Sequence, residues 1–106
     1  MIPVASNLVI SPVAPDIGED DITGTYDIVI SGNCGVDVST YAWVTSKGGG
    51  NILQSGTIAV SGVIPPYTPI PSDNQADIHF ELTPKSSCGQ TGATVLSSTV
   101  TPANNP

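Results

Sequence analysis

The segment that most constrains the fold is residues 77–83, where polar and apolar residues alternate without a break. Such alternation predicts a β-strand with one buried face, because successive side chains of an extended chain point to opposite sides. A half-buried strand needs neighbouring strands and a second layer to cover its apolar side. The apolar row is Ile78, Phe80 and Leu82, and the polar row is Asp77, His79 and Glu81.

The composition is that of a chain of strands and turns. Its 106 residues include 11 glycines and 10 prolines; 39% of the residues are hydrophobic and only 10% are charged. This is too apolar for a disordered chain and too poor in helix-forming residues for a helical bundle. The length is that of one domain able to bury its own core.

The charge balance excludes several kinds of partner. Nine carboxylates against two lysines give a formal charge of −7. Nucleic acids are bound by clusters of Lys and Arg, so we do not expect one as a partner. The same charge is repelled by anionic membranes, and no apolar run approaches the roughly 20 residues of a spanning helix. Because residues 1–7 do not look like a signal peptide, we expect a chain used without export or one that begins after a removed segment.

Further strands are expected on both sides of residues 77–83. Prolines at positions 3, 12 and 15 confine residues 1–15 to an extended N-terminal arm with a short edge strand. Residues 16–100 are expected to form the sandwich, and residues 101–106 a flexible polar tail. The strand-like segments are residues 8–10, 25–31, 39–45, 52–54, 57–61 and 93–100, the fourth and fifth being either separate strands or one strand with a bulge at Ser55 and Gly56.

With residues 26–31 as strand B, Trp43 in strand C and Phe80 in strand F, the chain resembles an immunoglobulin-like or fibronectin-III-like domain. The resemblance implies an all-β, antiparallel sandwich of about seven strands, with Trp43 at the centre of the core. The expected core residues are Tyr26, Ile28, Ile30, Trp43, Ile58, Val60, Ile78, Phe80 and Leu82.

The two cysteines, Cys34 and Cys88, depart from the antibody pattern because they follow strands B and F instead of lying inside them. Strands B and F run the same way in this topology, so the two cysteines would be neighbours at one end and a disulfide would be feasible. The absence of a signal peptide favours free thiols, so both states stay open. Two cysteines are too few for a structural zinc site.

Two clusters have residue types that could carry chemistry. His79 between Asp77 and Glu81 could bind a metal or shuttle a proton, but alternation alone explains the row as the wet face of a strand. Residues 16–21 hold four carboxylates, which suit Ca²⁺, but their spacing is not that of an EF-hand and a solvated loop explains them. We therefore predict no catalytic, cofactor-binding or metal-binding residue, and no enzyme.

The proline-rich segment of residues 64–71 is expected to be a polyproline-like connection, since prolines exclude a central strand. An exposed extended segment with apolar side chains is a ready docking element, although it could also serve only as a strap over the sandwich edge. Together with the polar row it supplies the predicted partner contacts, which are Pro65, Pro66, Tyr67, Pro69, Ile70, Asp77, His79 and Glu81.

Small stand-alone domains of this kind resemble accessory proteins of bacteriophage particles, such as capsid decoration proteins. The resemblance implies a structural module that binds a protein lattice in a virion assembled in the host cytoplasm, with self-association left open. The alternative is an extracellular adhesion or carbohydrate-binding module at a cell surface, in which Tyr41 or Tyr67 would stack on sugar. An enzyme that uses His79 is the third hypothesis.

Overall fold

The computed structural model describes residues 2–29, 34–35, 37–58 and 62–104. This part of the chain contains no α-helix and only two single-turn 3-10 helices, η1 (Lys47–Gly49) and η2 (Pro71–Asp73). The predicted all-β class is thus confirmed, with nine described strands where about seven were expected. The strands are β1 (Val4–Ser11), β2 (Asp16–Ile17), β3 (Ile22–Val29), β4 (Ser39–Thr45), β5 (Asn51–Ile58), β6 (Val63–Tyr67), β7 (Ile78–Thr83), β8 (Val95–Leu96) and β9 (Ala103–Asn104).

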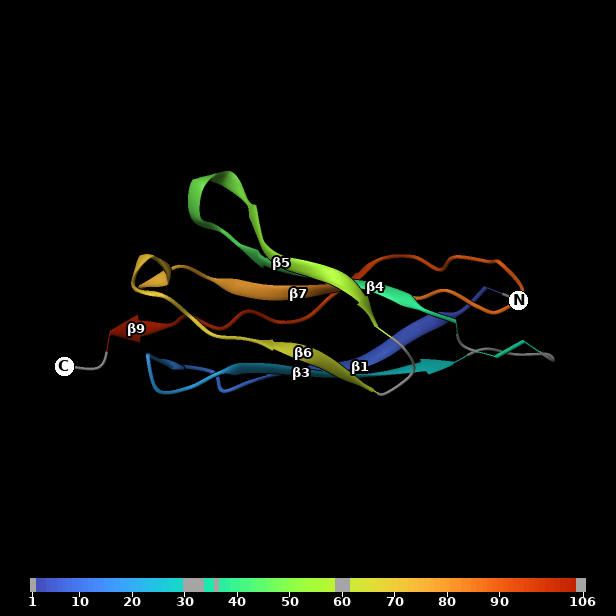
Figure 1. Cartoon of the computed structure of the whole chain (residues 1–106), viewed down its shortest axis with the longest axis horizontal. Helices are drawn as coiled ribbons and strands as arrows, with labels where there is room; N and C mark the ends of the chain where they lie inside the picture. Colours follow the sequence, from blue (N-terminus) through green and yellow to red (C-terminus); the bar gives the residue numbers. More distant parts are fainter. Residues whose placement is uncertain (1, 30–33, 36, 59–61, 105–106) are drawn as a thin grey trace.

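The strands form two main sheets that pack as layers (Figure 1). One sheet has the order β1-β3-β6 and the other has the order β5-β4-β7-β8, and all the pairs within them are antiparallel. The short strands β2 and β9 pair in parallel as a third, separate sheet. The described residues contain no helix that is long and apolar enough to cross a membrane.

The centre of the core is formed by Trp43 on β4 and Phe80 on β7, which are directly opposite each other in the ladder. Both side chains are fully buried, and their rings meet edge to face with centroids 5.4 Å apart. The facing sheet makes room for them at Gly24, where a Cβ would lie 2.8 Å from Cε2 of Phe80. A bare backbone at Gly24 therefore allows β3 to approach the Phe80 ring closely.

Most of the expected core residues lie in the interior. Tyr26, Trp43, Ile58, Ile78, Phe80 and Leu82 are buried, and Ile28 packs against them while partly exposed. Ile30 and Val60 fall outside the described residues. The structure adds residues that were not on the expected list: Ala5, Ile10, Ile22, Ile64 and Tyr67 from the sheet β1-β3-β6, Tyr41 from β4, and Val100 from the last segment.

The proline-rich segment begins with a true strand. β6 pairs with β3 at the edge of its sheet, and Pro65 and Pro66 coincide with a shift of register in that pairing. Prolines are tolerated there because edges and bulges require fewer amide donors. The carbonyl oxygen of Pro65 accepts a hydrogen bond from Trp43 Nε1 at 2.8 Å, and that of Pro66 accepts one from Gln54 Nε2 at 3.4 Å. These bonds fasten β6 to the opposite sheet.

The ends of the chain differ from the predictions. β1 is a full strand of the first sheet, so most of the expected arm belongs to the sandwich. The prediction of a flexible tail is wrong for residues 101–104. β9 pairs with β2, and the Pro102 carbonyl accepts a hydrogen bond of 2.8 Å from the backbone N–H of Gln75. Residues 105–106 are outside the described part.

The hairpin of β4 and β5 also differs in detail from the prediction. β5 is one continuous strand, and its irregularity lies at Leu53 instead of at Ser55 and Gly56. Register places Trp43 opposite Gln54 and the next residue, Val44, opposite Ile52, so Leu53 is the extra residue. The loop of this hairpin stands out from the rest of the chain in Figure 1.

Candidate functional site

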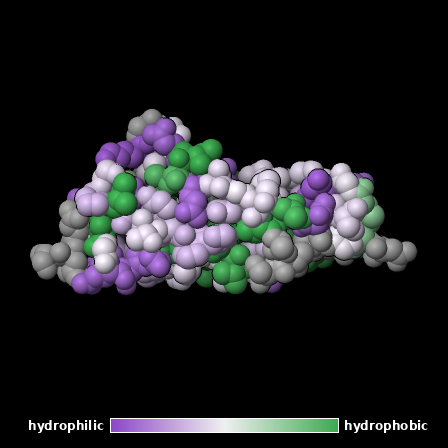
Figure 2. Space-filling view, viewed as in Figure 1, coloured by the Kyte–Doolittle hydropathy of each residue, from purple (hydrophilic) through white to green (hydrophobic). Residues whose placement is uncertain are grey.

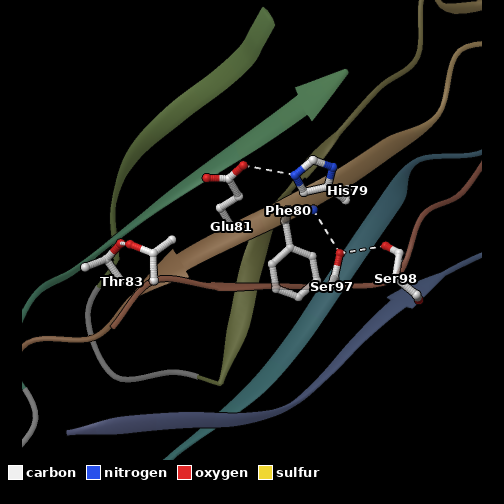
Figure 3. Close-up of polar contacts among 7 residues, drawn as sticks. His79, Phe80, Glu81, Thr83, Ser97 and Ser98 are labelled. Carbon is white, nitrogen blue, oxygen red and sulfur yellow. Dashed lines mark hydrogen bonds and ion pairs between the residues drawn. The ribbon is translucent and has the colours of Figure 1, made fainter. Parts of the chain in front are cut away.

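The polar row of β7 does not act as one group. His79 Nε2 and Glu81 Oε2 are 3.0 Å apart, with both side chains partly buried. The Asp77 carboxylate lies apart from this pair, and its Oδ1 accepts a hydrogen bond of 2.7 Å from Thr101 Oγ1. Figure 3 shows His79 and Glu81 on one side of β7 and the ring of Phe80 on the other. The predicted row therefore consists of a hydrogen-bonded pair, His79 and Glu81, and a separate carboxylate, Asp77, that holds the C-terminal segment.

The hydroxyls near this pair tie the last segment to β7. The Phe80 amide donates to Ser97 Oγ at 2.9 Å, and the Ser97 amide donates to the Phe80 carbonyl at 2.9 Å. Ser97 Oγ in turn donates to the Ser98 carbonyl at 2.8 Å (Figure 3). The Ser97 hydroxyl is thus committed to the backbone on both sides, and its role is to continue the ladder beyond β8.

Within the described ranges, no three side chains of His, Cys, Asp and Glu gather in a way that could hold a metal. The acidic segment instead bonds within the protein: Asp20 Oδ2 accepts the Asp16 amide at 3.0 Å, and Asp21 Oδ1 accepts the Thr68 hydroxyl at 2.8 Å. No pocket is found in this part of the chain either.

Two of the predicted contact residues in the proline-rich segment are interior residues. Tyr67 and Pro69 are buried, whereas Pro66 and Ile70 are exposed and Pro65 is intermediate. Buried side chains cannot contact a partner in this fold, so the docking element that the sequence suggested is reduced to Pro65, Pro66 and Ile70.

A buried carboxylate, Asp73, organises the connection between β6 and β7. It is only 3% exposed, and its Oδ2 accepts a 2.7 Å bond from the Tyr67 hydroxyl and a 2.8 Å bond from the Ile70 amide. Asp73 was not among the residues expected from the sequence. The available signal was Pro71 followed by Ser72 and Asp73, since proline favours the first position of a helical turn and an acid favours its N-terminus.

This environment raises the pKa of Tyr67, first because burial disfavours the phenolate and then because the hydrogen bond to Asp73 and its negative charge do so as well. The folded state then holds the proton above pH 10, where the unfolded state releases it, so folding stability falls as the pH rises past about 10. We expect the free energy of unfolding of the wild type to exceed that of Tyr67→Phe by a constant amount from pH 7 to pH 9. Above about pH 10 this excess should shrink, because only the wild type loses stability there. Urea unfolding at successive pH values measures it, and a constant difference up to pH 11 would contradict the assignment.

Cys34 and Cys88 form a disulfide, with Cα atoms 5.7 Å apart. It joins the segment after β3 to the segment between β7 and β8. The two segments are also linked by hydrogen bonds, since the Gly35 amide donates to Ser87 Oγ at 2.8 Å and the Ser87 amide donates to the Gly35 carbonyl at 2.9 Å. The bridge is therefore one part of a wider connection at this end of the molecule.

The outward side of the sheet β1-β3-β6 has a different character, and we call it the valine face. Cross-strand register places Val4 opposite Val29, and places Val9 and Val63 on either side of Thr25. The four valines are between 50% and 61% exposed. The strands of this sheet carry a single charged residue, Asp27, whose Oδ2 accepts a bond of 2.9 Å from Asn7 Nδ2.

The valine face was missed at the sequence level because its residues come from three separate segments. The available signal was the alternation in residues 22–29, where Thr23, Thr25 and Val29 are β-branched residues on the polar side of the pattern. In Figure 2, hydrophobic residues are spread along the visible side, and hydrophilic residues are frequent toward the end where β9 lies in Figure 1.

Comparison with protein-family models, with curated proteins and with solved structures finds no match to this chain.

Proposed function

We propose that the chain is a non-enzymatic structural module, a decoration or accessory protein of a virus capsid that binds a protein lattice. The observation that carries the proposal is the valine face. An exposed cluster of apolar, β-branched side chains on one side of a sheet is typical of a protein contact surface, since its burial removes apolar area from water.

The distribution of charge supports such a contact. The chain carries a formal charge of −7, yet the strands of the valine face hold one carboxylate, Asp27. Interface cores are depleted in charged residues, while charge elsewhere keeps the free protein dispersed. The charge on the rest of the molecule would thus keep free chains from associating through the valine face until they meet a surface that covers the valines.

The strand order supports an immunoglobulin-like sandwich of the fibronectin-III kind. Taking β1, β3 and β6 as strands A, B and E, and β5, β4, β7 and β8 as C′, C, F and G, reproduces the two sheets of such a domain. Domains of this kind serve as binding modules on many particles and cell surfaces, and function has to be argued from their surfaces.

The second candidate is an adhesion module at a cell surface, and the Cys34–Cys88 disulfide favours it. Disulfides persist in oxidising compartments, outside the cytoplasm. Sugar stacking on Tyr41 or Tyr67 does not fit, because these rings are only 8% and 9% exposed. An adhesion module of this fold would therefore have to use a surface other than these two rings.

Gold-labelled antibody raised against the chain separates the two candidates. Purified virus particles from the source of the gene and the envelopes of its host cells are labelled in parallel. We expect regular labelling of the particles. Labelling of cell envelopes alone would overturn the capsid proposal and leave the adhesion module.

A matched pair of substitutions tests the role of the valine face. Thr25 is the exposed residue at its centre on β3, and Thr40 is an exposed threonine on β4, the corresponding strand of the opposite sheet. We expect Thr25→Lys to weaken binding to undecorated particles at least tenfold, because a charge would be buried in an apolar contact. Thr40→Lys should bind as the wild type does. Equal binding of both variants would contradict this use of the face.

A further inference from the structure

The edges of the two main sheets differ in how they are protected. An open edge presents unpaired backbone groups, and proteins commonly blunt it with prolines, bulges, charges or a short strand. β6 carries Pro65 and Pro66, and β8 is only two residues long. β1 has a register shift between Ser6 and Val9, where Asn7 takes a positive φ of 52°. Three of the four edges are therefore protected.

The fourth edge, β5, has none of these protections over most of its length. It has eight residues, Asn51–Ile58, with no proline and no charged side chain. Its one irregularity is at Leu53, so residues 54–58 are a regular strand that pairs only with β4 among the described residues. Gln54 holds this strand in place, since its amide nitrogen donates to the Tyr41 hydroxyl at 3.2 Å. The β5 edge is therefore an ordered, extended strand with which another strand can pair.

We propose that β5 pairs antiparallel with β5 of a second copy of this chain, joining the two four-stranded sheets across a two-fold axis. The argument for a second copy is self-complementarity. The outward residues of the regular part are Ser55 and Thr57, which are small and uncharged. The chain as a whole carries a net charge of −7, but β5 has no charged side chain. Two copies of β5 can therefore pair in any antiparallel register without placing like charges opposite each other. Two-fold dimers are the commonest closed assemblies. This dimer does not depend on the proposed capsid function.

Sedimentation velocity across a range of concentrations tests the proposal. We expect the wild type to pass from monomer to dimer with a dissociation constant between about 1 µM and 1 mM, the range of a small contact. A wild type that stays monomeric up to about 1 mM would overturn it.

A pair of double variants locates the contact. Ser55→Lys with Thr57→Lys places like charges opposite each other across the dimer, and we expect the dissociation constant to rise at least about tenfold. The matched control changes the residues directly opposite on β4, Ala42→Lys with Thr40→Lys, and should dimerise as the wild type does. If the control loses dimerisation equally, or if the β5 variant keeps it, the contact is not the β5 edge.

Charge rescue gives a readout that misfolding could not imitate. Mixing the β5 double-Lys variant with a double-Glu variant at the same positions should restore a dimer containing one copy of each, because opposite charges then face each other. Amide exchange supplies a second readout: protection of β5 should rise with wild-type concentration, while that of β6 should not change. Absence of both effects in a folded protein would overturn the proposal.

Discussion

Trp43→Ala is expected to lower the free energy of unfolding by about 3–5 kcal/mol. The side chain is fully buried, meets the Phe80 ring edge to face and donates its indole N–H to the Pro65 carbonyl. Truncation leaves a cavity between the sheets and removes the bond that fastens β6 to β4. Since domains of this size are stable by only about 5–15 kcal/mol, the variant should be close to unfolding.

Urea unfolding followed by circular dichroism measures the loss, because the substitution removes the only tryptophan of the chain. Val13→Ala is the control: this residue is 77% exposed, and its truncation should change stability by less than about 0.5 kcal/mol. A loss below about 1 kcal/mol for Trp43→Ala would show that the two sheets do not pack through this residue.

Removing the disulfide is expected to have a comparable effect. Cys34 and Cys88 are 54 residues apart, and closing a loop of that length restricts the unfolded chain enough to stabilise the fold by about 4 kcal/mol. The double variant Cys34→Ser with Cys88→Ser should therefore melt well below the oxidised wild type. The substitution acts mainly on the unfolded state, so the sheets themselves should be preserved.

Thermal melting with and without a reductant provides the comparison. Reductant should lower the melting temperature of the wild type to about that of the double variant and should leave the double variant unchanged. A wild type whose melting is insensitive to full reduction would contradict a stabilising role for the bridge. Free-thiol titration before each scan establishes the redox state.

The strands with regular alternation were predictable from the sequence. Residues 77–83 carry an apolar row, and this row becomes the buried face of β7. Trp43 on β4 was also expected in the core, and it meets Phe80 there. Local alternation is enough in such cases because each residue's face follows from its position along the strand.

Features that depend on pairing between distant segments were not predictable. β9 exists because residues 103–104 meet residues 16–17, and nothing in a short polar tail indicates that pairing. β6 was hidden by its prolines, which a strand tolerates at a sheet edge or at a shift of register, and β6 has both. The buried hydroxyl of Tyr67 has its hydrogen-bond partner in Asp73, which the turn after β6 brings within reach.

The same limit applies to the candidate site. The sequence indicated a polar row and a proline-rich segment as contact residues, whereas the structure buries Tyr67 and Pro69 and ties Asp77 to Thr101. The valine face emerges only when β1, β3 and β6 are placed side by side, because each strand contributes only one or two valines.

The most direct test of the proposed docking is an electron cryomicroscopy reconstruction of the particle that the antibody labels. We expect the domain to lie with the sheet β1-β3-β6 against the lattice, with Val9, Thr25 and Val63 in the contact and the acidic residues 16–21, which begin with β2 beside β9, in solvent. A reconstruction in which these three residues face solvent would contradict the central claim that the valine face is the binding surface.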